Sequence, residues 1–254
     1  MSHSGFCLLL CSLLVSCDAT RQDSAQVESA NTSPANTSPA ETIVDDSSIA
    51  PLPNSNPVAD ESNAEWQSLF NHKDLTGWKP TNFGGEGDVA IKNGEMRFDL
   101  GYPMTGVTWT VDQDKDVSLP TTDYEISLEA KKLDGNDFFC GLTFPVNDSH
   151  CSLIVGGWGG TLVGLSCIDG EDASNNDTKL HQNFANDRWY KIRVLVSGDR
   201  IRVVIDDKSV IDRDISSSEV SVRDEVMLSR PFGICCFDTQ ASFRQIKVRR
   251  IKKK

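Results

Sequence analysis

Apolar and polar residues alternate through most of the chain beyond its first quarter, as they do in half-buried β-strands. Residues 124–131, 190–196 and 201–205 each place every second side chain on an apolar face and direct mostly polar side chains to the other face. Asn93-Gly94 separates two shorter segments and supplies the positive-φ residues of a hairpin turn, and Gly198-Asp199 marks a second tight turn. No stretch keeps an apolar period of about 3.6 residues over a helix length, so the pattern predicts an all-β sandwich of antiparallel strands.

Near the N-terminus a short apolar run, residues 6–16, leads to Leu14-Val15-Ser16-Cys17. Small residues before a cysteine fit a lipobox, in which the cysteine is diacylated, and the run is too short to span a bilayer. We therefore expect residues 1–17 to be a lipoprotein-type signal peptide with Cys17 as the lipidation site. A plain cleaved signal and a buried apolar segment stay open as alternatives, because the first five residues contain no Lys or Arg. Both signal interpretations predict an exported protein, periplasmic or at the cell surface, and the favoured one confines membrane contact to the lipid anchor.

Residues 18–65 are rich in Ser, Asn, Thr, Pro, Ala and acidic residues, and they repeat Asn-Thr-Ser-Pro-Ala at 31–35 and 36–40. Such a segment cannot bury enough apolar surface to offset its ordering entropy, so we expect a disordered acidic linker. Its nine acidic residues and one Arg give a net charge of −8, which leaves only −4 of the chain's −12 for residues 66–254. That remainder has the length of one domain with a sizeable core.

The C-terminus of the domain is basic, from Arg244 through Lys252-Lys253-Lys254. A surface that contacts anionic phosphate is one interpretation, and a solvated edge strand with a frayed tail is the favoured one. No other feature supports nucleic-acid binding, and we expect none.

Residues 66–254 contain five cysteines. A disulfide between Cys140 and Cys151 is one interpretation, but directly opposed strand residues often bridge poorly, so buried free thiols are favoured slightly. No cysteine or histidine cluster has zinc spacing, and we expect neither a metal nor another cofactor. The acidic loop 169–177 resembles a calcium loop in its alternating acids, although Gly170 and the absence of a late Glu spoil the EF-hand pattern, so a structural calcium stays open.

The domain is framed by two motifs, LFNHKDLTGWK at residues 69–79 and FGI at 232–234 with FRQIKV at 243–248. With these motifs, residues 66–251 resemble the bacterial family of 3-keto-disaccharide hydrolases, also described as 3-keto-glycoside lyases or hydratases. The resemblance implies that residues 66–254 form a concanavalin-A-like jelly roll of two antiparallel sheets. It also implies a hydrolase or lyase that acts on glycosides, including oxidised 3-keto sugars, so the expected partner is a saccharide or glycoside.

Between the two motifs the chain departs from the family's pattern at polar positions. Cys140-Gly141 takes the place of a Ser-Gly pair, Pro145 stands where the family has Arg, and Cys235-Cys236 replaces the usual His after the closing strand. Since one fold can host unrelated functions, two classes remain: a glycoside hydrolase or lyase, and a non-catalytic, lectin-like carbohydrate-binding module.

A single Trp lies among four glycines at residues 156–160, ahead of the acidic loop 169–177. The glycines let the backbone turn sharply and leave the Trp158 indole without large neighbours in sequence. An exposed ring covers the apolar face of a pyranose, while nearby carboxylates and amides bind its hydroxyls. A tight turn around a core Trp is an equally weighted alternative. The expected substrate-binding residues are Trp158, Asn147, Asp172, Asn175, Trp109 and His181.

His150 is the first catalytic candidate, because an unperturbed imidazole titrates near neutral pH and can act as general acid or base. A surface His without a catalytic role is the alternative. Asp148 and Asp169 complete the expected catalytic set.

The predicted site has one geometric difficulty. We expect His150 and Trp158 at one mouth of the sandwich, yet a hairpin of residues 137–145 and 150–156 puts them at opposite ends of one strand. At ~3.3 Å per residue they would be about 20 Å apart unless the sheet curves or the glycines break the strand.

Replacing Cys17 by Ser should release the protein from membranes or mislocalise it, because the acyl chains contribute about 0.8 kcal/mol per buried methylene. Cell fractionation and a lipid-labelling assay measure this. Cys11→Ser, which alters a cysteine inside the apolar run, is the matched control and should leave the membrane fraction unchanged. Unaltered fractionation of the Cys17→Ser variant would contradict the lipobox interpretation.

Overall fold

The computed structural model describes residues 64–110 and 119–251. The predicted signal peptide, its Cys17 and residues 18–63 of the predicted linker lie outside the described residues. Within the described part, no helix is long and apolar enough to cross a membrane.

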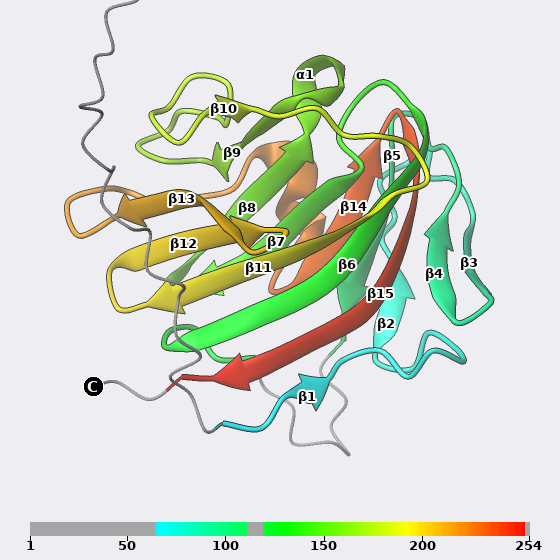
Figure 1. Ribbon diagram of the computed structural model, residues 1–254, viewed down its shortest axis with the longest axis horizontal. Coiled ribbons are helices and arrows are strands. Elements are labelled where there is room, and N and C mark those ends of the chain that lie inside the picture. Colours follow the sequence, from blue (N-terminus) through cyan, green and yellow to red (C-terminus); the bar gives the residue numbers. More distant parts are fainter. Residues whose placement is uncertain (1–63, 111–118, 252–254) are drawn as a thin grey trace, which may run out of the picture. The chain divides into compact units, whose positions relative to one another are not determined.

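The strands form two sheets that pack as layers, and every strand pairing within them is antiparallel (Figure 1). The first sheet has the order β13-β12-β11-β6-β15-β4-β3, with β1 paired to β15. Its strands are β1 (Gln67–Ser68), β3 (Val89–Lys92), β4 (Glu95–Phe98), β6 (Tyr124–Gly135), β11 (Trp189–Ser197), β12 (Arg200–Ile205), β13 (Lys208–Asp214) and β15 (Thr239–Arg250).

The second sheet has the order β10-β9-β8-β7-β14-β5-β2. Its strands are β2 (Trp78–Pro80), β5 (Met104–Trp109), β7 (Cys140–Val146), β8 (Ser149–Gly156), β9 (Leu162–Ser166), β10 (Leu180–His181) and β14 (Gly233–Phe237). Among the described residues there are also two short helices, α1 (Gly157–Gly160) and the 3-10 helix η1 (Asp224–Ser229). The expected jelly-roll sandwich of two antiparallel sheets is confirmed.

Local sequence signals placed the hairpins correctly. Asn93 and Gly94 both have positive φ, 55° and 76°, and join β3 to β4. The expected hairpin in the middle of the chain is β7 with β8, where Cys140 faces Val155 and Val146 faces Ser149.

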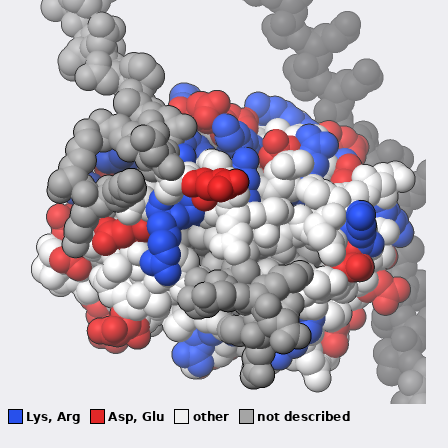
Figure 2. Space-filling view, turned by 90° about the horizontal axis from the view of Figure 1, so that it is seen from below, with Lys and Arg blue, Asp and Glu red and all other residues white. Residues whose placement is uncertain are grey.

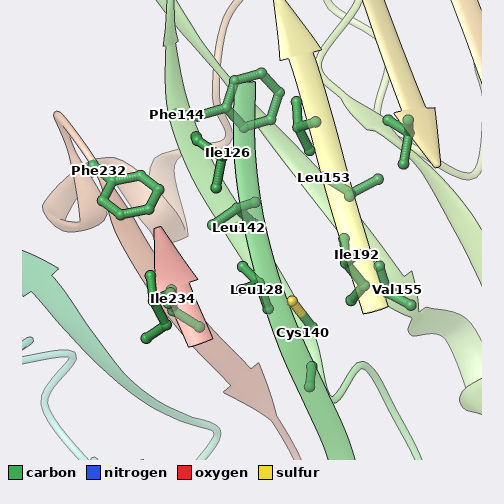
Figure 3. Close-up of a cluster of buried hydrophobic side chains, with 14 of the residues drawn as sticks. Ile126, Leu128, Cys140, Leu142, Phe144, Leu153, Val155, Ile192, Phe232 and Ile234 are labelled. Atoms are coloured by element: carbon green, nitrogen blue, oxygen red, sulfur yellow. The ribbon is translucent and has the colours of Figure 1, made fainter. Parts of the chain in front are cut away.

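The core lies between the sheets, where the inward side chains of both layers interlock. Figure 3 shows Ile126 and Leu128 of β6 close to Leu142 of β7 and Leu153 of β8. These four side chains are completely buried, and the alternation in the sequence predicted this for Ile126 and Leu128. Because successive side chains of a strand point to opposite faces, this packing also decides which residues of the second sheet point away from the core.

The outward face of the second sheet is partly covered as well. Ile154 of β8, Leu162 of β9 and Cys235 of β14 belong to a second, smaller apolar cluster. Phe138 and Val226, from segments that cross this face, complete its cover. Both faces of the second sheet therefore carry packed side chains, and the outer cover leaves a cavity.

The five described cysteines are buried free thiols. Cys140 and Cys151 cannot form the disulfide considered above, because they face Val155 and Phe144, which puts them several residue pairs apart along the hairpin. Burial raises the pKa of Cys151 to about 12, so the thiol stays neutral and packs as a small apolar group.

Residues 244–250 of the basic segment belong to β15, which is not an edge strand, so the edge-strand interpretation is wrong; the tail Lys252-Lys253-Lys254 lies outside the described residues. β15 lies between β6 and β4, and its arginines meet acidic side chains of β6. Arg244 Nε lies 2.6 Å from Glu129 Oε2, and Arg249 Nη2 lies 2.6 Å from the buried Glu125 Oε2. Figure 2 likewise shows basic and acidic side chains interspersed over the face seen from below in Figure 1.

Trp109, expected to bind substrate, lies in the core instead. It occupies the last position of β5 on the inward face, is only 7% exposed, and packs edge-on against Trp78 with ring centroids 5.1 Å apart. Its ring also fills the space beside Gly77, where an added Cβ would lie 2.7 Å from Trp109 Cζ3. Trp109 is buried because its position on β5 points toward the core, and the residue type alone does not reveal this direction.

Trp109→Ala should lower the free energy of unfolding by about 3–5 kcal/mol, because it opens a large cavity in the core. Trp158→Ala is the matched control: that ring is 44% exposed, and its removal should change stability by about 1 kcal/mol or less. Chemical denaturation of the two variants measures the difference. Equal losses would show that the two rings do not differ in burial as described.

Candidate functional site

A cavity of about 260 Å³ opens on the outward face of the second sheet. Its floor comes from strands β8 and β9, and its sides come from the segments that cross this face. The floor is formed by Ser152, Ile154 and Ser166. One set of wall residues is apolar: Met104, Phe138, Val226 and Phe237. The other walls are formed by Trp158 and by the charged residues Asp137, Asp172, Arg223 and Glu225.

Phe138 forms one apolar wall because β7 has a glycine beneath it. An added Cβ at Gly141 would lie 2.9 Å from Phe138 Cε2, so any larger residue would push the ring away from the sheet. The Phe138 ring also meets Phe237 of β14, with centroids 5.6 Å apart. The aromatic wall is therefore fixed by contacts with two strands.

Trp158 extends over the cavity from α1, directly after β8. Its backbone is left-handed, with φ 47° and ψ 59°, and the flanking Gly156 and Gly159 have φ values of 82° and 87°. A bulky residue rarely adopts this conformation, which costs roughly 1–2 kcal/mol, whereas glycine adopts it freely. The glycines thus build the turn, and the indole that it presents is exposed rather than part of the core.

Asp137 holds this turn through one carboxylate oxygen. Its Oδ1 accepts hydrogen bonds from the backbone N–H of Phe138 at 2.7 Å and of Trp158 at 3.2 Å. Thr239 fixes the Asp137 backbone, because its hydroxyl donates to the Asp137 carbonyl at 2.9 Å. No described residue donates to Oδ2, the second oxygen. The cavity therefore has a carboxylate of fixed orientation with one oxygen available to a ligand.

Arg223 joins two acidic residues across the opposite side of the cavity. Its Nη1 lies 2.8 Å from Asp172 Oδ2, and its Nη2 lies 2.6 Å from Glu225 Oε1. Partial burial raises the pKa of Asp172, but hydrogen bonds from Ser174 and the charge of Arg223 outweigh it, so the pKa lies below its usual value. The hydrogen bond from Arg223 lowers the pKa of Glu225. Both carboxylates are therefore held as anions.

The acidic loop 169–177 is organised by its own side chains. Asp172 Oδ1 accepts hydrogen bonds from the Ser174 N–H and hydroxyl at 2.8 and 2.6 Å. Asn175 Nδ2 lies 3.3 Å from the same oxygen, and Asn175 lines a neighbouring surface cavity. Among the residues described, no group of three or more His, Cys, Asp or Glu side chains is placed to hold a metal ion.

The expected catalytic histidine lies away from Trp158. His150 is near the start of β8 and Trp158 follows its end, so the strand separates them by roughly 20 Å. His150 shares the outward parity of Ser152 but does not line the cavity. Burial and the positive charge of Arg230 lower its pKa.

Four other expected residues also lie outside the cavity. Asn147 and Asp148 form the turn at the β7–β8 end that is remote from Trp158. Asp169 Oδ1 accepts a hydrogen bond from the N–H of Glu219 at 2.8 Å, which ties down a crossing segment. His181 is exposed on β10. Of the residues expected from the sequence, Trp158 and Asp172 line the cavity together, and their contact with a ligand stays a prediction.

The other polar residues of the cavity have no distinctive sequence pattern. Asp137 precedes an aromatic pair just before β7, which is a pattern too common to single it out. Arg223 meets Asp172 across 51 positions of sequence, and Ser152 faces Ser166 only through strand register. No spacing rule links such positions, because sheet pairing brings them together.

A two-sheet jelly roll with an aromatic and carboxylate-lined cavity on one outer face defines the class of this domain. Residues 65–249 match the family model of the 3-keto-alpha-glucoside-1,2-lyase-like domain, and the chain belongs to this family. No curated protein matches the chain.

Several solved structures are similar to the chain at low identity. The carbohydrate-binding module CBM66 from Bacillus subtilis is 19% identical, with a TM-score of 0.44, 69% of this chain covered and 97% of that one. A putative glycosyl hydrolase from Parabacteroides distasonis is 14% identical, with a TM-score of 0.44 and coverages of 74% and 94%. A Bacillus subtilis protein with a galectin-like fold is 8% identical, with a TM-score of 0.49 and coverages of 76% and 99%. Likeness at this level carries no argument about function.

Arg223→Met should destabilise the protein in a pH-dependent way. A carboxyl whose folded-state pKa is lowered contributes stability above its unfolded pKa, about 4, and loses it as the pH falls through the folded value. The difference in unfolding free energy between wild type and variant should thus be about 1 kcal/mol or less near pH 7 and shrink below about pH 4. Denaturation at several pH values measures it, with Lys208→Met as control. A difference that is constant with pH would contradict the ion-pair assignment.

Proposed function

We propose that this cavity binds a saccharide and that the protein cleaves 3-keto-α-glucosides by elimination across C1 and C2. The family name supplies the reaction class, and the cavity supplies groups suited to it. The observation that carries the proposal is Asp137, whose Oδ1 is fixed by two backbone N–H groups while Oδ2 remains available beside an exposed Trp.

Saccharide binding is supported by the pairing of an apolar surface with fixed polar groups. The Trp158 indole and the Phe138 ring offer faces or edges to the C–H groups of a pyranose. Asp137 Oδ2 can accept a hydrogen bond from a sugar hydroxyl. The volume, about 260 Å³, is close to the lower end for small-ligand pockets, about 300 Å³, so it suits a single sugar ring better than a polymer segment.

The chemistry of a 3-keto-glucoside requires one well-placed base. The proton on C2 is acidic because the carbanion formed by its removal is conjugated with the C3 ketone. When a base takes this proton, the C–H electron pair forms the C1=C2 double bond, and the C1–O bond breaks with its electrons on the departing oxygen. That oxygen takes up a proton from solvent and the base later returns the C2 proton to solvent, so no net proton is gained or lost. Asp137 Oδ2 is the base in this proposal, and a positioned base contributes typically about 10²–10⁴-fold to the rate.

Binding without catalysis is the second candidate function. Asp172 and Glu225 are held as anions by Arg223, so neither is suited to donate a proton to the departing oxygen. A lectin-like module needs only the aromatic surface and the hydrogen-bonding groups. The two candidates therefore differ in whether cleavage accompanies binding.

We also propose that the domain works outside the cytoplasm, tethered through a lipid on Cys17 by the linker 18–65. The basis is the lipobox and the composition of the linker.

Asp137→Asn should lower kcat/KM for a 3-keto-α-glucoside by about 100-fold or more. Asn keeps an Oδ1 that can accept both backbone hydrogen bonds, so the Trp158 turn should persist and substrate affinity should change by only a few-fold. Release of the free aglycone, measured by chromatography against an enzyme-free blank, reports the rate. Asp134→Asn, an exposed carboxylate on β6, is the matched control and should retain full activity.

Binding is measured in parallel by calorimetry. Trp158→Ala should weaken saccharide affinity about tenfold through loss of the stacking surface. Saccharide binding by a wild-type protein that cleaves nothing would support the lectin-like function and overturn the elimination. Full activity in Asp137→Asn would overturn the role assigned to this carboxylate.

A further inference from the structure

Two serine hydroxyls lie side by side on the floor of the cavity. Ser152 of β8 faces Ser166 of β9 in the strand register, and both line the cavity. Each is only 1% exposed. Apart from them the floor offers Ile154, and the neighbouring walls are Met104 and Phe138. The deepest polar groups of the site are therefore these two hydroxyls in apolar surroundings.

Their hydrogen-bonding capacity is not filled by the protein. A serine hydroxyl has one donor and two acceptor positions. Ser152 Oγ lies 2.9 Å from Thr143 Oγ1, which uses one of them. For Ser166 Oγ the sole described partner is the Cys167 sulfur at 3.6 Å, and sulfur is a weak partner. The remaining capacity of the two hydroxyls is available to an oxygen or nitrogen supplied from the cavity.

The charged residues on the other side of the cavity are less available to a ligand than the two serines. Arg223, Asp172 and Glu225 are bonded to one another, and a ligand group would have to displace those partners. A group that reaches the serines displaces no protein partner. The floor is therefore where a ligand gains a polar contact that the free protein lacks.

We propose that Ser152 and Ser166 form a subsite for one exocyclic hydroxyl of the bound sugar, and that this subsite makes the protein select sugars that carry this hydroxyl. The inference rests on the saccharide site proposed above and does not depend on cleavage. A hydroxyl of the ring donates to one serine oxygen and accepts from the other. An analogue without that hydroxyl leaves Ser166 with only its weak sulfur partner and Ser152 with only Thr143, which weakens binding about 10- to 100-fold.

The experiment measures the affinities of methyl α-glucoside and of its monodeoxy analogues, each lacking one hydroxyl, for wild type and variants by calorimetry. In wild type, one analogue should bind about 10- to 100-fold more weakly than the parent sugar. In Ser166→Ala and Ser152→Ala, the affinity for methyl α-glucoside should fall toward the affinity for that analogue. The ratio of the two dissociation constants should therefore approach one. Ser127→Ala, a buried serine on β6 in the other sheet, is the matched control and should keep the wild-type ratio.

Each outcome has a separate meaning. If wild type binds methyl α-glucoside, and both serine variants keep the wild-type ratio of affinities for the parent sugar and its deoxy analogue, this inference is overturned. The saccharide site would be left intact. If wild type bound neither methyl α-glucoside nor its 3-keto form, the saccharide site itself would be overturned, and this inference with it. Thermal melting shows whether the variants are folded. If Ser166→Ala does not fold, Ser166→Cys provides the comparison and Ser166→Thr, which keeps a hydroxyl, is its control; a ratio that stays at the wild-type value in Ser166→Cys would equally overturn the inference.

Discussion

The strict alternation of side chains along β8 and β9 is the constraint on which the cavity depends. Leu153 and Val155 pack between the sheets, so Ser152 and Ile154 must point to the outer face. A register shift of one residue would exchange the two sets and place hydroxyls in the core. The free energy gained by burying the inward leucine and valine therefore also fixes the floor of the site.

The carboxylate of Asp137 couples the shape of the cavity to its chemistry. One of its oxygens accepts a hydrogen bond from the backbone N–H of Trp158. This bond helps to hold a left-handed backbone conformation that a Trp seldom adopts. The orientation of the indole and that of the second oxygen are thus set by the same residue. A ligand that stacks on the ring meets a carboxylate oxygen in a fixed relation to it, which is the preorganisation that both binding and proton transfer require.

The charges around the cavity also restrict the class of ligand that it would accept. The sides of the cavity carry the carboxylates of Asp137, Asp172 and Glu225 against the single guanidinium of Arg223. This excess of negative charge disfavours uronates and sugar phosphates and is compatible with a neutral sugar. Arg223 also joins the acidic loop to η1, so the same ion pairs that set the charge also connect two of the segments around the opening.

Local sequence determined the strands, the Asn93-Gly94 hairpin and the glycine turn around Trp158, because alternation and glycine placement act over a few neighbouring residues, but it left open whether the Trp158 ring is exposed. Tertiary structure alone decided the rest. Trp109 looks like a second exposed aromatic residue in sequence, but its register on β5 turns it into the core. Arg223 and Asp172, and likewise the two serines of the floor, meet only because crossing segments and paired strands bring distant positions together. Such contacts depend on packing that no local pattern encodes, which is why the sequence located the Trp of the site but not the groups that surround it.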